Sequence, residues 1–175
     1  QDLIDGRYLL DDRSWRWNRE ASQQLAFDLQ QKTRVSLKFY ADEKSFVSAL
    51  ALHDNVGDQY CLRIIDTFVD TEEELYAIVT EWDDTTLAKM LDTGRLLLPE
   101  ILVIVRSLAL LLDRYEVLGL VETLLDPSRI VRIGRDWKMI NFDHLLPAGQ
   151  WMRVDVEISG PAYLSPEVAS AWRTA

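Results

Sequence analysis

Apolar and polar residues alternate through most of the first half of the chain, which is the pattern of strands with one buried face. Leu25, Phe27 and Leu29 form such a series, and we expect them to share the buried face of one strand. The predicted strands span 5–12, 22–30 and 34–41, with two more inside 59–82 that are joined by the acidic turn DTEEE.

Helical spacing replaces this alternation in three segments, 42–53, 85–94 and 98–119. The third is the clearest, because Pro99 suits a first helical turn and Gly119 suits a helix end. Its apolar residues run almost all round, so we expect most of its sides to be buried. A hairpin with a GRD turn is predicted over 128–142, then a long loop, then a helix from Ser165.

Composition and charge narrow the possible functions. The chain has 175 residues, of which 48% are hydrophobic, and this is enough for one folded domain with a core. Its net charge of −10 disfavours nucleic acid or an anionic membrane surface as a ligand. The single cysteine, Cys61, excludes an internal disulfide and favours an intracellular, reducing compartment such as the cytoplasm.

Five short motifs follow one another along the chain, namely VSLKFY, TEW, LVETLLDPSRIVRI, MINFDHLLP and GPAYLSPEV. In this order they resemble the landmarks of protein kinases. VSLKFY (35–40) resembles the strand that carries the kinase lysine, and TEW (80–82) resembles the hinge. LVETLLDPSRIVRI (120–133) resembles the catalytic loop and the strand that follows it. MINFDHLLP (139–147) resembles the strand that ends in Asp-Phe-Gly, and GPAYLSPEV (160–168) resembles the end of an activation segment.

The resemblance runs from Asp5 to Arg173 and implies a fold. We expect an α+β, two-lobed protein-kinase-like architecture with a small β-rich lobe and a truncated helical lobe. The kinase-like N-lobe spans 1–82, and a partial C-lobe spans 83–175 and ends just after the SPE motif.

The residues at the first matched positions have lost part of the kinase chemistry. Lys38 matches the kinase lysine, but Ala49 stands where the resemblance places its glutamate partner. Two interpretations of Lys38 remain: a strand residue whose tip reaches solvent, or a vestigial nucleotide-binding residue that still attracts an anion. The segment that matches the glycine-rich loop contains no glycine between Asp12 and Phe27, which argues against a phosphate cradle there.

The match to the catalytic loop is also degenerate. Leu124 occupies the position of the catalytic base and cannot accept a proton, while Arg129 occupies the position of a magnesium-binding asparagine and would repel the metal. Asn141 replaces the metal-binding aspartate of Asp-Phe-Gly and removes its charge, Phe142 keeps the apolar role, and Asp143 replaces the glycine. The resemblance therefore implies no catalytic residues and no metal or other cofactor.

Glu167 matches the acid of the Ala-Pro-Glu motif, which in the family pairs with an arginine from later helices. Such helices do not follow within this sequence, and the chain begins with Gln1 rather than Met, so we expect a fragment. Either the missing C-terminal helices or a protein partner is then needed to cover the apolar helix from Pro99 to Leu118. Without that cover we expect the chain to aggregate or self-associate.

The sequence thus predicts an inactive kinase-like domain, or pseudokinase, that acts as a protein-binding or scaffold module in a larger protein or complex. Two alternatives stay open. One is a weak, metal-independent nucleotide sensor that uses Lys38, and the other is an unorthodox phosphotransferase that uses Asp126 or Asp143 as a displaced acid. His53 and His144 lack cysteine neighbours at ligand spacing, so a metal site is not expected.

Overall fold

The computed structural model describes residues 3–11, 23–70, 75–94, 96–150, 166 and 170. The chain is of the α+β class and divides into two compact units, Gln1–Asp84 and Thr85–Ala175, which are described separately below. Among the helices of the described ranges, none is long and apolar enough to cross a membrane.

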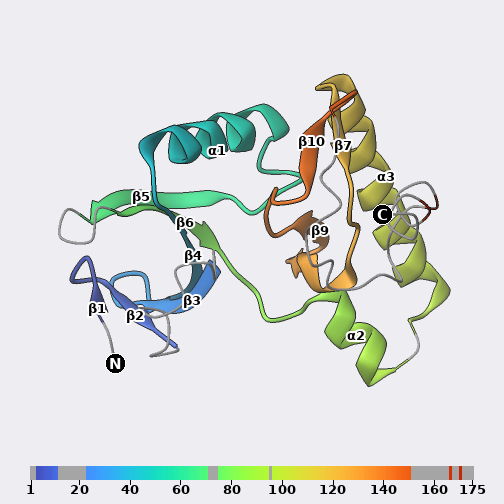
Figure 1. Cartoon of the computed structure of the whole chain (residues 1–175). Coiled ribbons are helices and arrows are strands. Elements are labelled where there is room, and N and C mark those ends of the chain that lie inside the picture. The colour runs from blue at the N-terminus through green and yellow to red at the C-terminus, as the bar shows by residue number, and fades with distance from the viewer. Residues whose placement is uncertain are drawn as a thin grey trace. The chain divides into compact units, whose positions relative to one another are not determined.

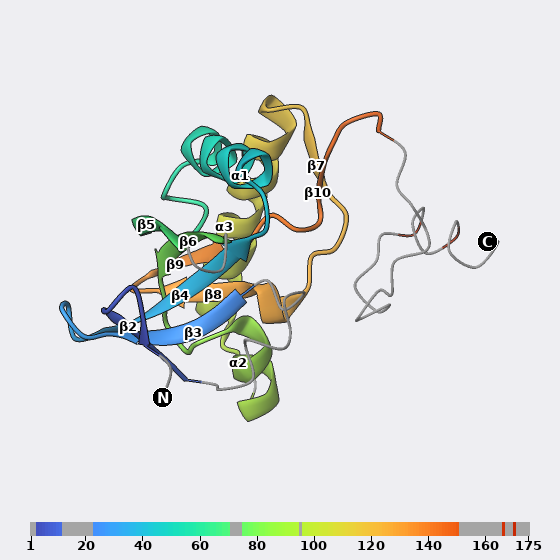
Figure 2. The same ribbon diagram turned by 60° about the vertical axis from the view of Figure 1, so that its left-hand side comes forward.

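The first unit is built on a six-stranded antiparallel sheet whose strands lie in the order β1, β2, β3, β4, β6, β5 (Figure 1). The strands are β1 (Leu3–Ile4), β2 (Tyr8–Leu10), β3 (Gln23–Asp28), β4 (Thr33–Tyr40), β5 (Ile64–Asp70) and β6 (Leu75–Glu81). The helix α1 (Glu43–Val56) follows β4 and packs on β4 and β6 (Figure 2). Asp42 caps α1 by accepting a hydrogen bond from the Ser45 amide at 2.8 Å.

The single strand predicted over 5–12 is wrong, because the chain reverses direction inside it. Asp5 and Gly6 have φ angles of 51° and 61°, in the left-handed region that aspartate and glycine tolerate better than other residues. The turn at Asp5–Arg7 joins β1 to β2, so the chain begins the sheet with a tight hairpin.

The predicted buried face of β3 is also wrong. Ala26 and Asp28 are fully buried, whereas Leu25 and Phe27 are half-buried and Leu29 is 46% exposed. Asp28 is tolerated inside because its carboxylate accepts hydrogen bonds from the Arg7 guanidinium at 2.6 and 3.0 Å. The core of this unit is formed by Ile4, Tyr8, Leu10, Ala26, Val35, Leu37 and Val79.

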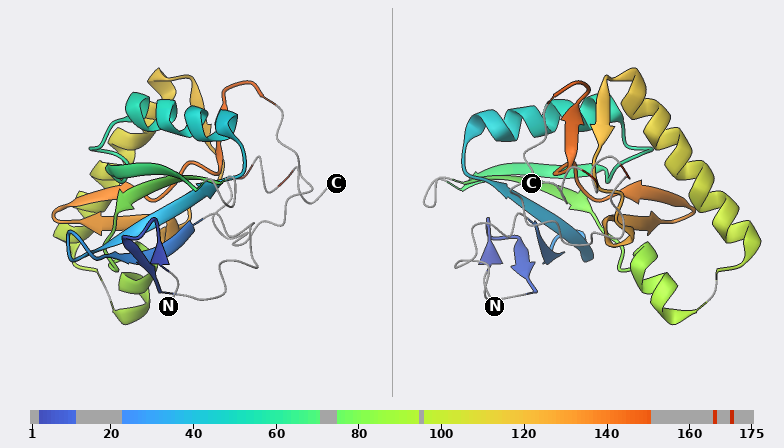
Figure 3. Two further views of the ribbon diagram at one scale, coloured as in Figure 1. Left: turned by 90° about the vertical axis from the view of Figure 1, so that its left-hand side faces the viewer. Right: turned by 45° about the vertical axis from the view of Figure 1, so that its right-hand side comes forward.

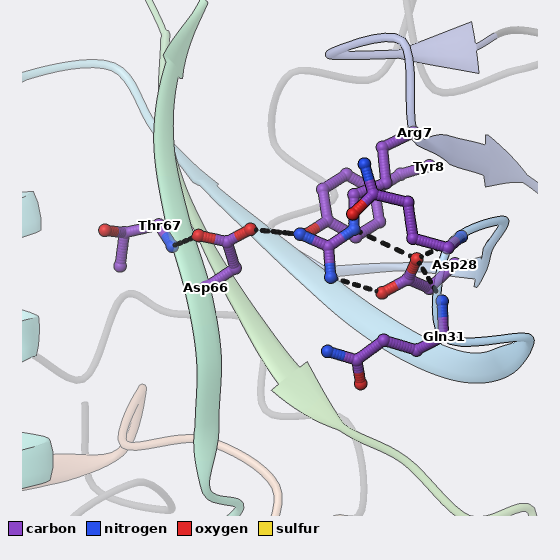
Figure 4. A network of polar contacts seen from close by, with 7 residues as sticks. Arg7, Tyr8, Asp28, Gln31, Asp66 and Thr67 are labelled. Atoms are coloured by element: carbon purple, nitrogen blue, oxygen red, sulfur yellow. Dashed lines mark hydrogen bonds and ion pairs between the residues drawn. The ribbon is translucent and has the colours of Figure 1, made fainter.

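Arg7 links three strands of the sheet through a polar network (Figure 4). Its guanidinium contacts Asp28 on β3 and also Asp66 on β5 at 2.6 Å, and the Tyr8 hydroxyl donates to Asp66 at 2.8 Å. The bonds from Arg7 lower the pKa of Asp28, although burial of the carboxylate opposes this shift. The backbone amides of Gln30 and Gln31 also donate to Asp28, which ties the β3–β4 turn to the same carboxylate.

In the described residues up to 150, the second unit contains two α-helices and two small two-stranded antiparallel sheets (Figure 3). The helices are α2 (Leu87–Thr93) and α3 (Leu98–Val117), and a short 3-10 helix, η2, spans Pro127–Arg129. One sheet pairs β7 (Leu120–Glu122) with β10 (Leu145–Pro147), and the other pairs β8 (Ile130–Ile133) with β9 (Asp136–Met139). The predicted GRD hairpin is confirmed as β8–β9.

The bounds of α3 follow the sequence prediction, but the burial of its apolar side chains does not. Its buried residues are Ile104, Leu111 and Tyr115, at the spacing of one helix face. The remaining apolar side chains are exposed, so the prediction that most sides are buried is wrong for this chain. The exposed ones are Leu98, Ile101, Leu102, Val103, Val105, Leu110, Leu112 and Val117.

We predict that Asp28→Asn lowers the free energy of unfolding by about 3 kcal/mol, because it leaves the largely buried Arg7 without its main counter-charge. Urea unfolding followed by circular dichroism measures the loss. The matched control is Arg34→Gln, which removes ion pairs to Asp11 and Asp84 from a guanidinium side chain that is 46% exposed. The control should lose less than about 1 kcal/mol; an equal loss in both variants would show that the buried network adds nothing.

Candidate functional site

Arg129 is the centre of a polar cluster in the second unit. It ends η2, immediately before β8, and Asp126 begins this short helix by accepting a hydrogen bond from the Ser128 amide at 2.7 Å. Pro127 favours the first turn of such a helix, because its fixed φ suits that position and its missing N–H is not needed there. The local sequence therefore determines the backbone conformation from which the Arg129 side chain extends.

The Arg129 guanidinium contacts Glu122 and two positions that the kinase resemblance singles out, Leu124 and Asn141. Its Nη1 donates to the carbonyl oxygen of Leu124 at 2.6 Å and to Oε1 of Glu122 at 3.2 Å. Its Nη2 donates to Asn141, to the side-chain Oδ1 at 2.9 Å and to the carbonyl oxygen at 3.2 Å. One side chain thus connects the loop after β7 to the turn after β9.

The pair formed by Arg129 and Glu122 is buried, since the two side chains are 11% and 1% exposed. Two of their polar atoms, Nε of Arg129 and Oε2 of Glu122, are buried without a hydrogen-bond partner among the described residues. Glu122 Oε1 also accepts from the Leu124 amide at 3.1 Å. Charge neutralisation inside the cluster compensates part of the cost of burying both ions.

The turn at Asn141–Asp143 is closed by the amide side chain. Oδ1 of Asn141 accepts from the Asp143 backbone amide at 3.4 Å in addition to Arg129. Asp5 and Lys32 are the non-glycine residues with positive φ in the described ranges, so the aspartate in place of glycine does not use a left-handed conformation. Phe142 is half-buried, and Asp143 is exposed.

His144 adjoins this cluster. Its carbonyl oxygen accepts from Thr123, both from the backbone amide at 3.0 Å and from Oγ1 at 2.8 Å. Partial burial lowers the pKa of the His144 imidazole, and the positive charge of Arg129 lowers it further. The ring is therefore held toward its neutral form beside the guanidinium.

Lys38 lies on β4 of the first unit and is half-buried, with Nζ 5.6 Å from the centre of the Tyr40 ring. Ala49 is half-buried on α1, and His53 follows one turn later on the same helix. His53 is buried, its Nδ1 lies 3.6 Å from the Cys61 thiol, and the charge of Lys38 acts on it. A histidine therefore lies within the electrostatic reach of the lysine that the resemblance left without its glutamate.

Sequence reasoning did not predict that His53 would lie near Lys38 and Cys61. Its helical spacing with Phe46 and Leu50 indicated an inward side chain, but not which strand it would meet. Burial, with the charge of Lys38 as a second cause, lowers the pKa of His53 to about 4. The imidazole is consequently neutral at physiological pH.

Not all predicted positions can be located. Glu167, the glycine-free segment from 12 to 22 and the acidic turn at 71–74 lie outside the described residues. In the ranges that are described, His, Cys, Asp and Glu side chains form no group of three or more that could hold a metal ion.

A pocket of about 280 Å³ opens near Glu122, between the C-terminal part of α3 and β7. Its walls are mostly apolar, and the residues that line it are Leu112, Tyr115, Glu116, Gly119, Leu120, Val121, Glu122 and Ala148.

Comparison of the chain with protein-family models gives no match, and comparison with curated proteins gives none either.

We predict that acid destabilises the first unit through His53. Its pKa is about 4 in the folded chain and 6.5 when unfolded, so the unfolded state binds a proton first as the pH falls. The stabilisation is complete above pH 6.5 and is lost between there and about pH 4. Urea unfolding of wild type and His53→Gln at pH 7.0 and 5.5 tests this, and we expect the wild type to lose roughly 1 kcal/mol more than the variant over this interval. Identical pH dependence in both proteins would contradict the assignment.

Proposed function

We propose that this chain is a catalytically inactive kinase-like domain, a pseudokinase with a two-lobed kinase-like architecture, that works as a protein-binding or scaffold module. The proposal rests on the kinase-like order of the sequence motifs and on the contacts of Arg129. It assigns the protein no phosphoryl-transfer activity.

The observation that carries the proposal is the position of the Arg129 guanidinium. It bonds to the carbonyl of Leu124, the position of the missing base, and to Asn141, the position of a missing metal-binding acid. Phosphoryl transfer needs a group that positions the nucleophile and cations that neutralise the phosphates. Here the sequence supplies neither the base nor the carboxylate, and a buried protein cation fills the intervening space.

The magnesium ion that kinases use does not fit these residues. Magnesium prefers carboxylate and phosphate oxygens in octahedral geometry. The Asn141 amide oxygen already accepts from Arg129, and a guanidinium at this distance repels a second cation. The displaced acids give no substitute, because Asp126 caps η2 and Asp143 is exposed on the turn.

The exposed apolar side of α3 supports the scaffold part of the proposal. Large contiguous apolar surfaces on folded domains mark interaction sites, and α3 leaves eight large aliphatic side chains at least 40% exposed. We propose that a protein partner, or further helices of a longer polypeptide, covers Pro99 to Leu118. The thiol of Cys61 is buried and forms no disulfide, which is compatible with the reducing, intracellular compartment proposed for this protein.

Thermal unfolding in the presence of ATP, with and without magnesium, tests the proposal together with a sensitive assay for ATP hydrolysis. We expect no shift of the melting temperature and no turnover. Lys38→Ala serves as the matched variant. A metal-independent shift that Lys38→Ala abolishes would identify a nucleotide sensor instead, and a magnesium-dependent shift with turnover would identify an enzyme and refute the proposal.

We predict that Asn141→Asp alone does not create magnesium binding, because Arg129 would pair with the new carboxylate. The expected effect is a gain of about 1 kcal/mol in the free energy of unfolding, since a charged acceptor strengthens the existing hydrogen bond. Combining it with Arg129→Asn should expose the carboxylates at 141 and 122 together and allow magnesium binding, measured by calorimetry. Asp143→Asn is the control on the same turn. Magnesium binding by Asn141→Asp alone would show that Arg129 does not control the site.

A further inference from the structure

The exposed side of α3 contains one straight row of residues, which we call the α3 row: Leu98, Leu102, Val105, Ala109, Leu112 and Glu116. Successive members are four and three residues apart, the spacing with which one helix packs along another. The four large aliphatic members are 41–67% exposed. At 1.5 Å per residue the row is about 27 Å long, the length of about five helical turns.

The row ends at the pocket beside β7. Leu112 and Glu116 belong to both, so an element lying along the row reaches the pocket without changing direction. Strand β7 contributes three consecutive residues to the wall of the pocket, Leu120, Val121 and Glu122.

The pocket is lined by one exposed carboxylate, Glu116, and by one buried carboxylate, Glu122, whose Oε1 already pairs with Arg129. Two of its lining residues, Glu116 and Glu122, are carboxylates, and none is lysine, arginine or histidine. The Glu122 side chain is only 1% exposed, and its Oε2 is buried without a hydrogen-bond partner in the described part of the chain. An unsatisfied buried acceptor is costly, so a donor that reaches it gains binding energy that an apolar group cannot. The other walls, including Leu112 and Leu120, suit the aliphatic stem of a basic side chain.

We propose that the α3 row and this pocket together bind an amphipathic helix of a partner protein. Its apolar side covers the row, and a lysine or arginine near one end enters the pocket and donates to Oε2 of Glu122, with Glu116 at the rim. This inference rests on the proposed scaffold function and specifies the chemistry of the partner.

A second copy of this chain is a poorer occupant. The α3 row contains no basic residue, so two copies packed through their rows would bring apolar and acidic groups together but no cation to the pocket. Arg106 and Arg114, the basic residues of α3, lie outside the row.

The test is selection of binders from a phage-displayed library of helical 20-residue peptides against the whole chain, followed by fluorescence anisotropy with the selected peptides. We expect apolar residues at alternating spacings of three and four, with a lysine or arginine near one end. Replacing that basic residue by norleucine should weaken binding about tenfold or more while the protein stays unchanged. In the chain, Leu102→Asp and Glu122→Gln should each have an effect of similar size, whereas Asp113→Asn, an exposed α3 carboxylate outside the row, should stay within about twofold of wild type.

Three results would overturn the inference. They are the absence of any enriched peptide, peptides whose binding is indifferent to norleucine, and a self-association that Leu102→Asp abolishes, which would make a second copy the occupant. Binding of purely apolar peptides to the same row would contradict the proposed role of the basic residue in the pocket, but it would not contradict the scaffold function. ATP turnover in the assay above would refute the inactive domain without changing the peptide result, so the two failures are distinguishable.

Discussion

The buried guanidinium of Arg129 is the interaction on which the second unit's polar interior depends. Through four hydrogen bonds it holds the loop after β7, the carboxylate of Glu122 and the turn at Asn141. A metal ion can hold such oxygens together only while it is bound, whereas an arginine is permanently charged and covalently attached. The cluster therefore keeps one arrangement without a ligand.

A buried arginine also holds carboxylates together in the sheet of the first unit. Arg7 is likewise shared between acids from different strands, and Asp28 is buried only because this cation and two turn amides satisfy it. In both units an arginine is buried against a carboxylate, so removing either member leaves an uncompensated charge in a poorly hydrated place. This dependence on paired charges explains why acidic residues occur at inward positions that the apolar pattern would have assigned to aliphatic ones.

Helix α3 differs from these buried polar clusters. One of its sides packs against the rest of the second unit, whereas its other sides expose apolar residues. Ile104, Leu111 and Tyr115 supply the packed side, while the outer aliphatic residues remain 40–71% exposed. Each such side chain gains roughly 1.5–3 kcal/mol when it is fully buried. That gain is the driving force available to the partner helix proposed above, and the pocket at the end of the row is lined by the carboxylate residues Glu116 and Glu122.

The sequence by itself determined the elements that depend on neighbours within one or two turns. Pro99 and Gly119 bounded α3, and short β-type patterns located β3 to β6. Only the tertiary structure decided which side chains meet. The reach of Arg129 to Asn141, the burial of Asp28 in place of Leu29, and the approach of His53 to Cys61 all join residues from separate elements. Local pattern fixes the direction of a side chain relative to its own helix or strand, but its partner depends on how the elements pack, which no short window of sequence contains.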